Sequence, residues 1–308
     1  MSEKEMEIMP QGGIEKQSEK ERGLNNRILL KIIRHGEKTP EGALTDYGRE
    51  KTRETVANDK KIIEGIQKVK VMGSNAGPKN EAGQARALET ADIYANTLVN
   101  EEYSDPEIIK YESRARSILE VVGQNTQPPF NWGKEYKENL PENFSELSDE
   151  DKAIASAEAN EKNLTKLMTM PEAEDYRQEI SARYAMFINT YIKMIDRIEN
   201  DQKIMYPVGA HGGQIELFLQ KCLKRKTEDG DEIIGFKDSK ELGGSFNPSE
   251  GFFIDITTDQ NGEKKIEFNF DDPKRFEGEE LSLDLDTMYE LIDKYKEKYG
   301  SFYDKQND

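Results

Sequence analysis

The sequence contains two histidines in 308 residues, and each comes directly before a glycine at the end of an apolar run. His35 follows Ile32-Ile33-Arg34, and His211 follows Pro207-Val208-Gly209-Ala210. Ligands of open α/β sheets bind beyond the carboxyl ends of the strands, where the N-termini of helices attract anions. We therefore expect both imidazoles to face one anionic substrate. The alternative is a pair of capping or core histidines, and the two matched contexts count against it.

The segments around these histidines alternate between strand and helix patterns. Arg27 to Arg34 is a short run of leucine and β-branched residues typical of a buried strand, and a charged helix with Thr45 as its N-cap follows over residues 45–58. The alternation continues with strands at 68–74, 108–112 and 204–210 and with helices at 81–100, 172–200 and 213–224. This pattern predicts an α/β fold with a doubly wound, mostly parallel sheet and helices on both of its faces.

Two regions depart from this alternation. Residues 251–258 and 263–270 flank Asp259-Gln260-Asn261-Gly262, which predicts a C-terminal β-hairpin, and an amphipathic helix follows at 285–299. Between about residues 122 and 170, a loop-like stretch and a polar helix predict an insertion that forms a cap beside the site. Its tryptophan, Trp132, either lines the substrate pocket or anchors a loop on the core.

Length and composition restrict the class of protein. We expect one elaborated domain over residues 26–308, preceded by a disordered polar tail at residues 1–25. The net charge of −18 counts against nucleic acid and anionic membranes as partners, because the long-range field repels both. Cys222 is the single cysteine, so an internal disulfide and a zinc cage of cysteine and histidine are excluded. Without a signal-peptide core or an 18-residue apolar run, the chain is expected in the cytoplasm.

The candidate residues form an ordered series of motifs. Arg34-His35-Gly36-Glu37 comes first, Leu44-Thr45-Asp46-Tyr47-Gly48 and Ser74 follow, and Arg86-Ala87-Leu88-Glu89-Thr90-Ala91 and Ala210-His211-Gly212-Gly213 complete the series. Over residues 27–220, this series resembles the histidine phosphatase superfamily, which has the phosphoglycerate-mutase-like fold. The acid phosphatase branch carries aspartate after its second histidine, whereas Gly212 stands here. The resemblance therefore points to the mutase-like branch, which includes mutases and phosphatases.

The resemblance implies a role for each residue. His35 would be the nucleophile, because a neutral imidazole can take up a phosphoryl group and split one difficult displacement into two easier ones. Arg34 and Arg86 would clamp the phosphoryl oxygens through planar guanidinium groups, and His211 would donate a hydrogen bond to the same oxygens. The further substrate-binding residues expected are Gly36, Lys38, Thr45 and Gly212. Lys38 either touches phosphate as a point charge or is solvated.

A leaving alkoxide needs a proton, which the phosphatases of this branch take from a glutamate beyond the second arginine. Glu112 is the best match, since it follows Ile108-Ile109-Lys110-Tyr111 at an expected strand end. Glu120 is the competitor, and either residue could instead be a solvated surface glutamate. Glu37 is expected to orient other groups rather than to act as the acid.

Three departures from the family pattern affect the choice of reaction. Residues 75–85 are inserted between Ser74 and Arg86, the usual asparagine soon after the first histidine is missing, and Lys51-Thr52 replaces the common Gln-Ala. The missing asparagine weakens a mutase interpretation more than a phosphatase one.

We expect a metal-independent phosphomonoester hydrolase without a cofactor, acting through a phosphohistidine on a small phosphorylated molecule or a phosphoprotein. The alternatives are a phosphomutase and a catalytically weak module that binds phosphate esters.

Overall fold

The computed structural model describes residues 21–39, 41–100, 108–120 and 125–302. Its centre is a six-stranded sheet with the order β3-β2-β4-β1-β7-β8. The strands are β1 (Arg27–Arg34), β2 (Lys68–Gly73), β3 (Ile109–Ala115), β4 (Lys203–Ala210), β7 (Gly251–Thr258) and β8 (Lys264–Phe270). The first four strands of this order are parallel to one another. At one edge, β7 pairs antiparallel with β1, and β8 pairs antiparallel with β7. The α/β class, the mostly parallel sheet and the C-terminal hairpin are confirmed.

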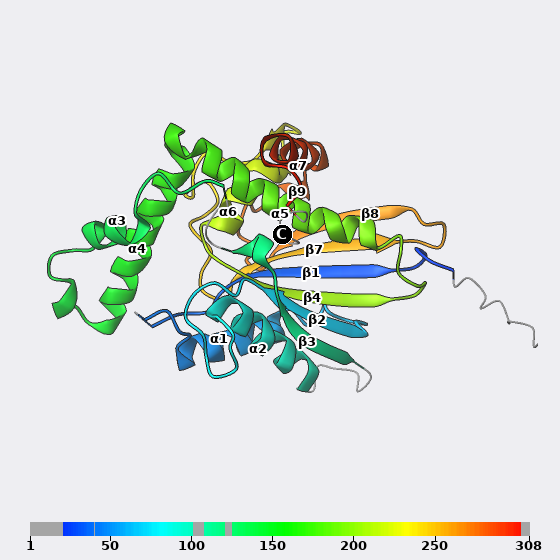
Figure 1. Ribbon diagram of the computed structural model, residues 1–308, viewed down its shortest axis with the longest axis horizontal. Helices are drawn as coiled ribbons and strands as arrows, with labels where there is room; N and C mark the ends of the chain where they lie inside the picture. The colour runs from blue at the N-terminus through cyan, green and yellow to red at the C-terminus, as the bar shows by residue number, and fades with distance from the viewer. Residues whose placement is uncertain (1–20, 40, 101–107, 121–124, 303–308) are drawn as a thin grey trace, which may run out of the picture.

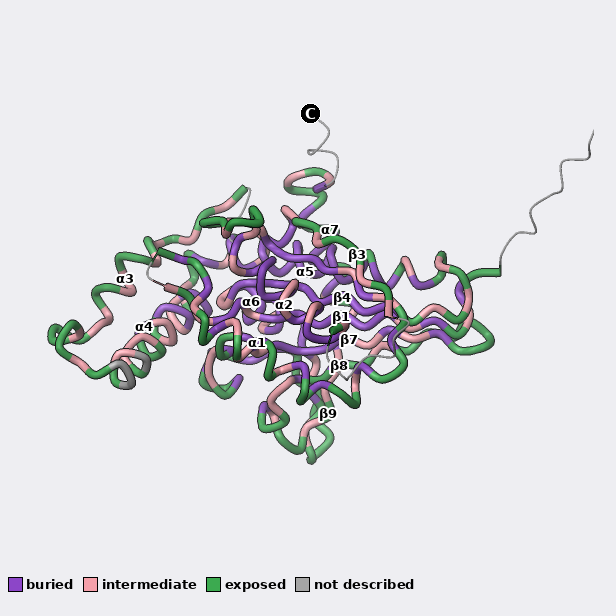
Figure 2. Tube along the Cα trace, turned by 90° about the horizontal axis from the view of Figure 1, so that it is seen from below, coloured by how far each residue is buried: buried purple, intermediate pink, exposed green. Residues whose placement is uncertain are grey.

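The two central strands are buried on both faces, as parallel strands usually are. Strand β1 pairs with β4 in register from Arg27 opposite Lys203 to Arg34 opposite Ala210. Because side chains alternate along a strand, Ile28 and Ile32 contribute to one core cluster while Leu29 contributes to the other. Figure 2 shows β1 and β4 as buried tubes in the middle of the molecule.

Helices cover both faces of this sheet, as predicted. In Figure 1, α1 (Asp46–Asn58) and α2 (Arg86–Asn100) lie below the sheet, and α5 (Glu174–Met194), α6 (Gln214–Cys222) and α7 (Leu285–Tyr299) lie above it. Helix α1 begins where the sequence predicts, since the Thr45 side chain accepts a hydrogen bond of 2.9 Å from the Gly48 amide.

A second, three-stranded sheet was not predicted. It consists of β6 (Glu232–Ile234), β5 (Leu223–Lys226) and β9 (Glu280–Leu283), in that order. The helix expected to extend to Lys224 ends at Cys222, because the next residues pair with a strand more than fifty positions away. The prediction of the helix end is therefore wrong, and a long-range pairing is the reason.

The segment predicted as an insertion contains two helices that project from the body on the left of Figure 1. These are α3 (Trp132–Asn139) and α4 (Asp149–Thr169), joined through a short 3₁₀ turn at Phe144–Glu146. We call residues 130–169 the arm. Helix α4 begins with an N-cap, since the Ser148 hydroxyl accepts from the Asp151 amide at 3.1 Å.

Of the predicted N-terminal tail, residues 1–20 lie outside the described residues. Residues 21–25 are hydrogen-bonded to the body: the Gly23 amide donates to the Ile198 carbonyl at 3.0 Å, and the Asn25 amide donates to the Asp259 carbonyl at 3.1 Å. Among the helices of the described ranges, none combines the length and the apolar character that crossing a membrane would require.

Candidate active site

The two histidines lie side by side at the carboxyl ends of adjacent parallel strands. His35 follows β1 and His211 follows β4, and the His35 amide donates to the Ala210 carbonyl at 2.9 Å. Their ring centroids are 5.3 Å apart, and only 7% of His35 and 2% of His211 is exposed. The structure thus brings together the two imidazoles that their matched sequence contexts singled out.

The hydrogen bond at His35 fixes its tautomer. Its Nδ1 lies 2.8 Å from the Gly36 carbonyl oxygen, which can only accept, so Nδ1 carries the ring hydrogen. Burial lowers the pKa of His35 well below its ordinary value, and the neighbouring His211, Arg86 and Arg34 lower it further. A neutral ring with its hydrogen on Nδ1 keeps a lone pair on Nε2, which is the form a nucleophile needs.

His211 is held by Ser74, a residue that belongs to the sequence motif but had no predicted role. The Ser74 hydroxyl oxygen lies 3.0 Å from His211 Nε2, and Arg86 Nη2 lies 3.5 Å from Nδ1 on the other side of the ring. Burial, Arg86 and Arg34 together lower the pKa of His211 to about 3, so the ring is neutral and carries one hydrogen. Because a guanidinium group can only donate, Nδ1 accepts from Arg86, and the ring hydrogen stands on Nε2, which donates to the Ser74 hydroxyl. A hydrogen bond from His211 to the phosphoryl oxygens stays a prediction.

Arg86 reaches the histidines because helix α2 packs closely on β4. A Cβ on Gly209 would lie 1.8 Å from the Ala87 carbonyl oxygen, so only glycine permits this approach. The guanidinium group of Arg86 is also flanked by two loops, since a Cβ on Gly77 or Gly42 would lie 3.2 or 3.6 Å from its Nη1. The inserted segment 75–85 therefore borders the site.

Arg34 lies beside the second histidine loop. Its Nη1 donates to the Phe246 carbonyl, and a Cβ on Gly212 would approach its Nε to 2.8 Å. Within the part of the chain that the structure describes, the buried Nε atoms of Arg34 and Arg86 have no hydrogen-bond partner. Two partly desolvated guanidinium groups beside two neutral imidazoles form a cationic site suited to a phosphoryl dianion.

The other predicted substrate contacts are placed as follows. Lys38 lies near the cationic site, since burial and then the charges of Arg86 and Arg34 lower its pKa. The amide of Gly36 is used in a hydrogen bond of 3.0 Å to the Thr90 hydroxyl. The Thr45 hydroxyl donates to Glu37 at 2.9 Å while it caps α1. Substrate contacts by Gly36 and Thr45 stay predictions. Glu37 accepts the hydrogen bond from Thr45 and so holds this side chain in place, as expected of an orienting residue.

The expectation that Glu112 ends its strand is wrong. Strand β3 continues to Ala115, which pairs with Gly73, and Glu112 lies within the strand where the register with β2 shifts. Its side chain lines a cavity of about 530 Å³ beneath the inserted loop, together with Asn75, Gln84, Asp92 and Lys110 among others. Neither histidine borders that cavity among the described residues.

Glu120 follows the strand end and lies closer to the second histidine loop. Its carbonyl accepts from the Gln214 side chain at 2.8 Å, and Gln214 begins α6 directly after His211-Gly212-Gly213. This backbone contact places Glu120 beside the second histidine loop, and which of Glu112 and Glu120 donates the proton stays a prediction.

Neither a protein-family model nor a curated protein matches the sequence. Solved structures do match. A mycobacterial glucosyl-3-phosphoglycerate phosphatase is 13% identical, with a TM-score of 0.38, over 84% of this chain and 96% of that chain. A phosphoserine phosphatase from Entamoeba histolytica in complex with 3-phosphoglyceric acid is 13% identical, with a TM-score of 0.36, over 79% and 96%. The protein histidine phosphatase SixA, complexed with tungstate, is 10% identical, with a TM-score of 0.29, over 79% and 97%.

The chain resembles the histidine phosphatase superfamily. The resemblance rests on the order of the sequence motifs, whose two histidines the structure brings together at one edge of the sheet.

Sequence reasoning missed a buried acidic residue that supports the site. Glu216 is fully buried, and its carboxylate accepts from the Gly213 amide at 2.6 Å and from the Phe246 amide at 3.1 Å. A glutamate three residues after an N-cap is a recognisable capping pattern, so Gly213 and Glu216 offered a signal. No local signal connects Phe246 to Arg34, because they are more than two hundred residues apart.

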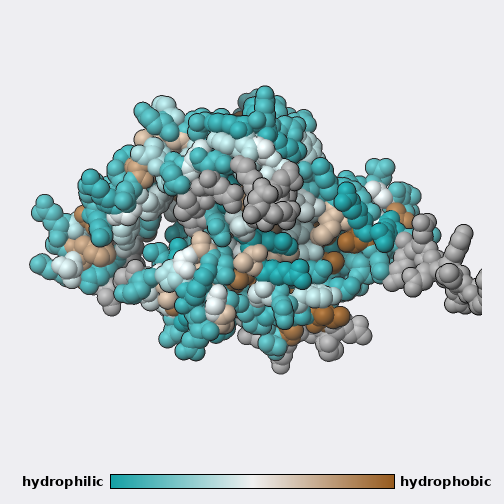
Figure 3. Space-filling model, viewed as in Figure 1, coloured by the Kyte–Doolittle hydropathy of each residue, from teal (hydrophilic) through white to brown (hydrophobic). Residues whose placement is uncertain are grey.

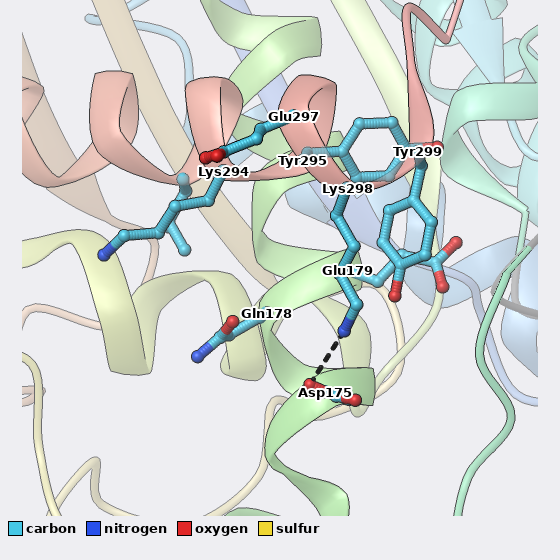
Figure 4. A pocket seen from close by; sticks show the side chains of 9 residues that line it. Asp175, Gln178, Glu179, Lys294, Tyr295, Glu297, Lys298 and Tyr299 are labelled. Carbon is cyan, nitrogen blue, oxygen red and sulfur yellow. Dashed lines mark ion pairs between the residues drawn. The ribbon is translucent and has the colours of Figure 1, made fainter.

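A further cavity of about 250 Å³ lies between α5 and α7, away from the histidines (Figure 4). Lys298 crosses it to form a 3.0 Å ion pair with Asp175. Of the described residues, none that lines this cavity belongs to the histidine site. Figure 3 shows a different hollow between the arm and the body of the molecule.

Proposed function

We propose that the protein is a phosphomonoester hydrolase that works through a phosphohistidine on His35. The observation that carries this proposal is the hydrogen bond from His35 Nδ1 to the Gly36 carbonyl, which leaves Nε2 unprotonated beside His211 and two guanidinium groups. A neutral nucleophile next to a cationic anion site is what phosphoryl transfer to an imidazole requires.

The residues divide the reaction between them. Nε2 of His35 attacks phosphorus, and the bond from phosphorus to the ester oxygen breaks. Arg34, Arg86 and a hydrogen bond from His211 stabilise the charge on the transferred oxygens. Glu120 protonates the leaving oxygen and then takes a proton from the water that attacks the phosphohistidine, releasing inorganic phosphate.

Neither a metal nor a cofactor has a step in this scheme. Across the described ranges, no three histidine, cysteine, aspartate or glutamate side chains gather as ligands of one metal ion would. Independence from metal is part of the proposal and is tested directly below. The substrate is proposed to be a small phosphorylated molecule or a phosphoprotein, encountered in the cytoplasm.

The first test measures inorganic phosphate released from an aryl phosphate and a panel of alkyl phosphates, with EDTA present, by the wild type and by His35→Ala. We expect release by the wild type and none by the variant, whose fold is checked by circular dichroism. Equal release by both proteins would refute a role for His35. Isomerised product without net phosphate would identify a phosphomutase, and binding without turnover would identify a binding module.

A further inference from the structure

The arm reaches the active site through one carboxylate. Glu161, on α4, accepts a hydrogen bond of 2.9 Å from the Ser245 amide through its Oε2. Ser245 directly precedes Phe246, whose carbonyl accepts from Arg34 Nη1. A residue of the projecting arm is therefore two hydrogen bonds away from a guanidinium group of the proposed phosphate clamp.

The segment that holds Arg34 is fixed by carboxylates at three successive amides. The Phe246 amide donates to Glu216, on α6 in the core, and the preceding amide donates to Glu161 on the arm. The Asn247 amide, which belongs to the same peptide unit as the Phe246 carbonyl, donates to Glu250 at 2.7 Å. Because carboxylates bind all three amides of this segment, the direction of the Phe246 carbonyl depends on Glu161, Glu216 and Glu250. Without the arm, one of these three fixed points is lost.

Charge couples the arm to the same guanidinium group. Burial lowers the pKa of Arg34, while the carboxylates of Glu216, Glu250 and Glu161 raise it. The second oxygen of Glu161, Oε1, is buried and has no hydrogen-bond partner among the residues described. The Glu161 carboxylate thus forms one identified hydrogen bond, to the segment that holds Arg34.

A second contact fixes the arm beside the other catalytic loop. The Trp132 ring lies 3.8 Å from the position of a Cβ on Gly213, two residues after His211. Asn163, which is fully buried on α4, donates to the Trp132 carbonyl at 3.1 Å. The same helix that carries Glu161 therefore also holds Trp132 in place, so the arm contacts both the Ser245–Phe246 segment and the loop after His211.

We propose that Glu161 is a positioning residue of the active site, through which the arm holds the Ser245–Phe246 segment and so directs Arg34 at the phosphoryl group. This inference rests on the proposed function. Arg34 should bind phosphate less well when the segment is released, because a guanidinium group binds an oxyanion strongly only in a fixed geometry.

The test measures the dissociation constant of inorganic phosphate by calorimetry, together with kcat and KM for an aryl phosphate. Glu161→Ala should weaken phosphate binding by about tenfold, within the range found for residues that act through a network. KM should rise by a similar factor with little change in kcat. Glu161→Gln should restore binding to within about threefold of wild type, because its amide oxygen can still accept from Ser245.

Glu158→Ala is the matched control, since Glu158 is an exposed glutamate one turn earlier on the same helix. It should bind phosphate as the wild type does. If Glu161→Ala does not fold, Glu161→Asp serves instead, since it keeps the charge but withdraws the oxygens by about 1.5 Å. The aspartate variant should then bind phosphate more weakly than Glu161→Gln.

Unchanged phosphate affinity in folded Glu161→Ala would overturn the inference, as would an aspartate variant that binds better than the glutamine variant. A loss of thermal stability without a loss of affinity would show that Glu161 only supports the fold. Phosphate binding without turnover in the wild type would refute the proposed hydrolase while leaving Glu161 testable. A wild type that binds no phosphate would refute both.

Discussion

At the scale of single residues, the two imidazoles of the site are neutral, while the neighbouring guanidinium groups are charged. Burial and the cations beside them lower the pKa of both His35 and His211. A lowered pKa widens the pH range in which each ring is neutral, and it does so toward acid. The nucleophile is therefore ready over a wider pH range than an ordinary histidine, whose pKa is about 6.5, would be.

The lowered pKa values of the two histidines predict how the site responds to pH. The two histidines should show no NMR titration between pH 5.5 and 8. After correction for the substrate's own ionisation near about pH 6, kcat/KM for an aryl phosphate, whose phenolate leaves without a proton, should stay level through this range. Because the sequence has two histidines, their ring signals can be assigned with His35→Ala and His211→Ala. A ring that titrates near pH 6.5 would contradict the buried, neutral pair.

The choice of proton donor can also be decided residue by residue. Glu120→Gln should slow hydrolysis of alkyl phosphates by about 10² to 10⁴, the usual worth of general acid catalysis. The same substitution should slow hydrolysis of an aryl phosphate less, because a phenolate leaving group does not need to be protonated. Glu112→Gln, on the exposed strand β3, is the matched comparison and should match the wild type on both esters. The reverse ranking would return the role to Glu112.

At the scale of elements, strand β1 carries a feature that its apolar run does not predict. Lys31, in the middle of Arg27–Arg34, is fully buried and forms ion pairs with Asp271 and, at 3.0 Å, with Asp59. Tyr94, on α2, donates to the same oxygen of Asp59 at 2.7 Å. This cluster ties the central strand to α2 and to the end of β8.

Lys31→Met should destabilise the protein by about 3 to 5 kcal/mol, because it leaves two buried carboxylates without their cation. Urea unfolding followed by circular dichroism measures the loss. Lys61→Met, at an exposed position soon after Asp59, should change the free energy of unfolding by less than about 0.5 kcal/mol. Similar stabilities for the two variants would show that the Lys31 cluster does not support the fold.

The sequence predicts elements where local patterns decide them and fails where distant partners do. The runs ending at His35 and His211, the Thr45 cap and the final hairpin follow from apolar runs, capping and turn residues. The extent of β3 and the strand after α6 depend on pairing with other strands, which no local pattern encodes.

At the scale of the whole molecule, an acidic protein with a net charge of −18 holds a local cationic site for an anion. The cations at this site are Arg34 at the end of β1, Lys38 in the loop that follows, and Arg86 at the start of α2. Their order along the chain and the glycines beside them allowed the motif residues to be predicted. The supporting residues Ser245, Phe246 and Glu161 could not be, because the arm and the 245–246 segment meet only in the folded chain.

The most direct test of the central claim is to trap the intermediate. The protein is mixed with an aryl phosphate, quenched in alkaline denaturant to preserve phosphohistidine, and digested for mass spectrometry. We predict a phosphoryl group on His35, absent from His35→Ala and still present in His211→Ala at a reduced rate of formation. Turnover with no phosphoryl group on His35, or with one on another residue, would contradict the phosphohistidine mechanism.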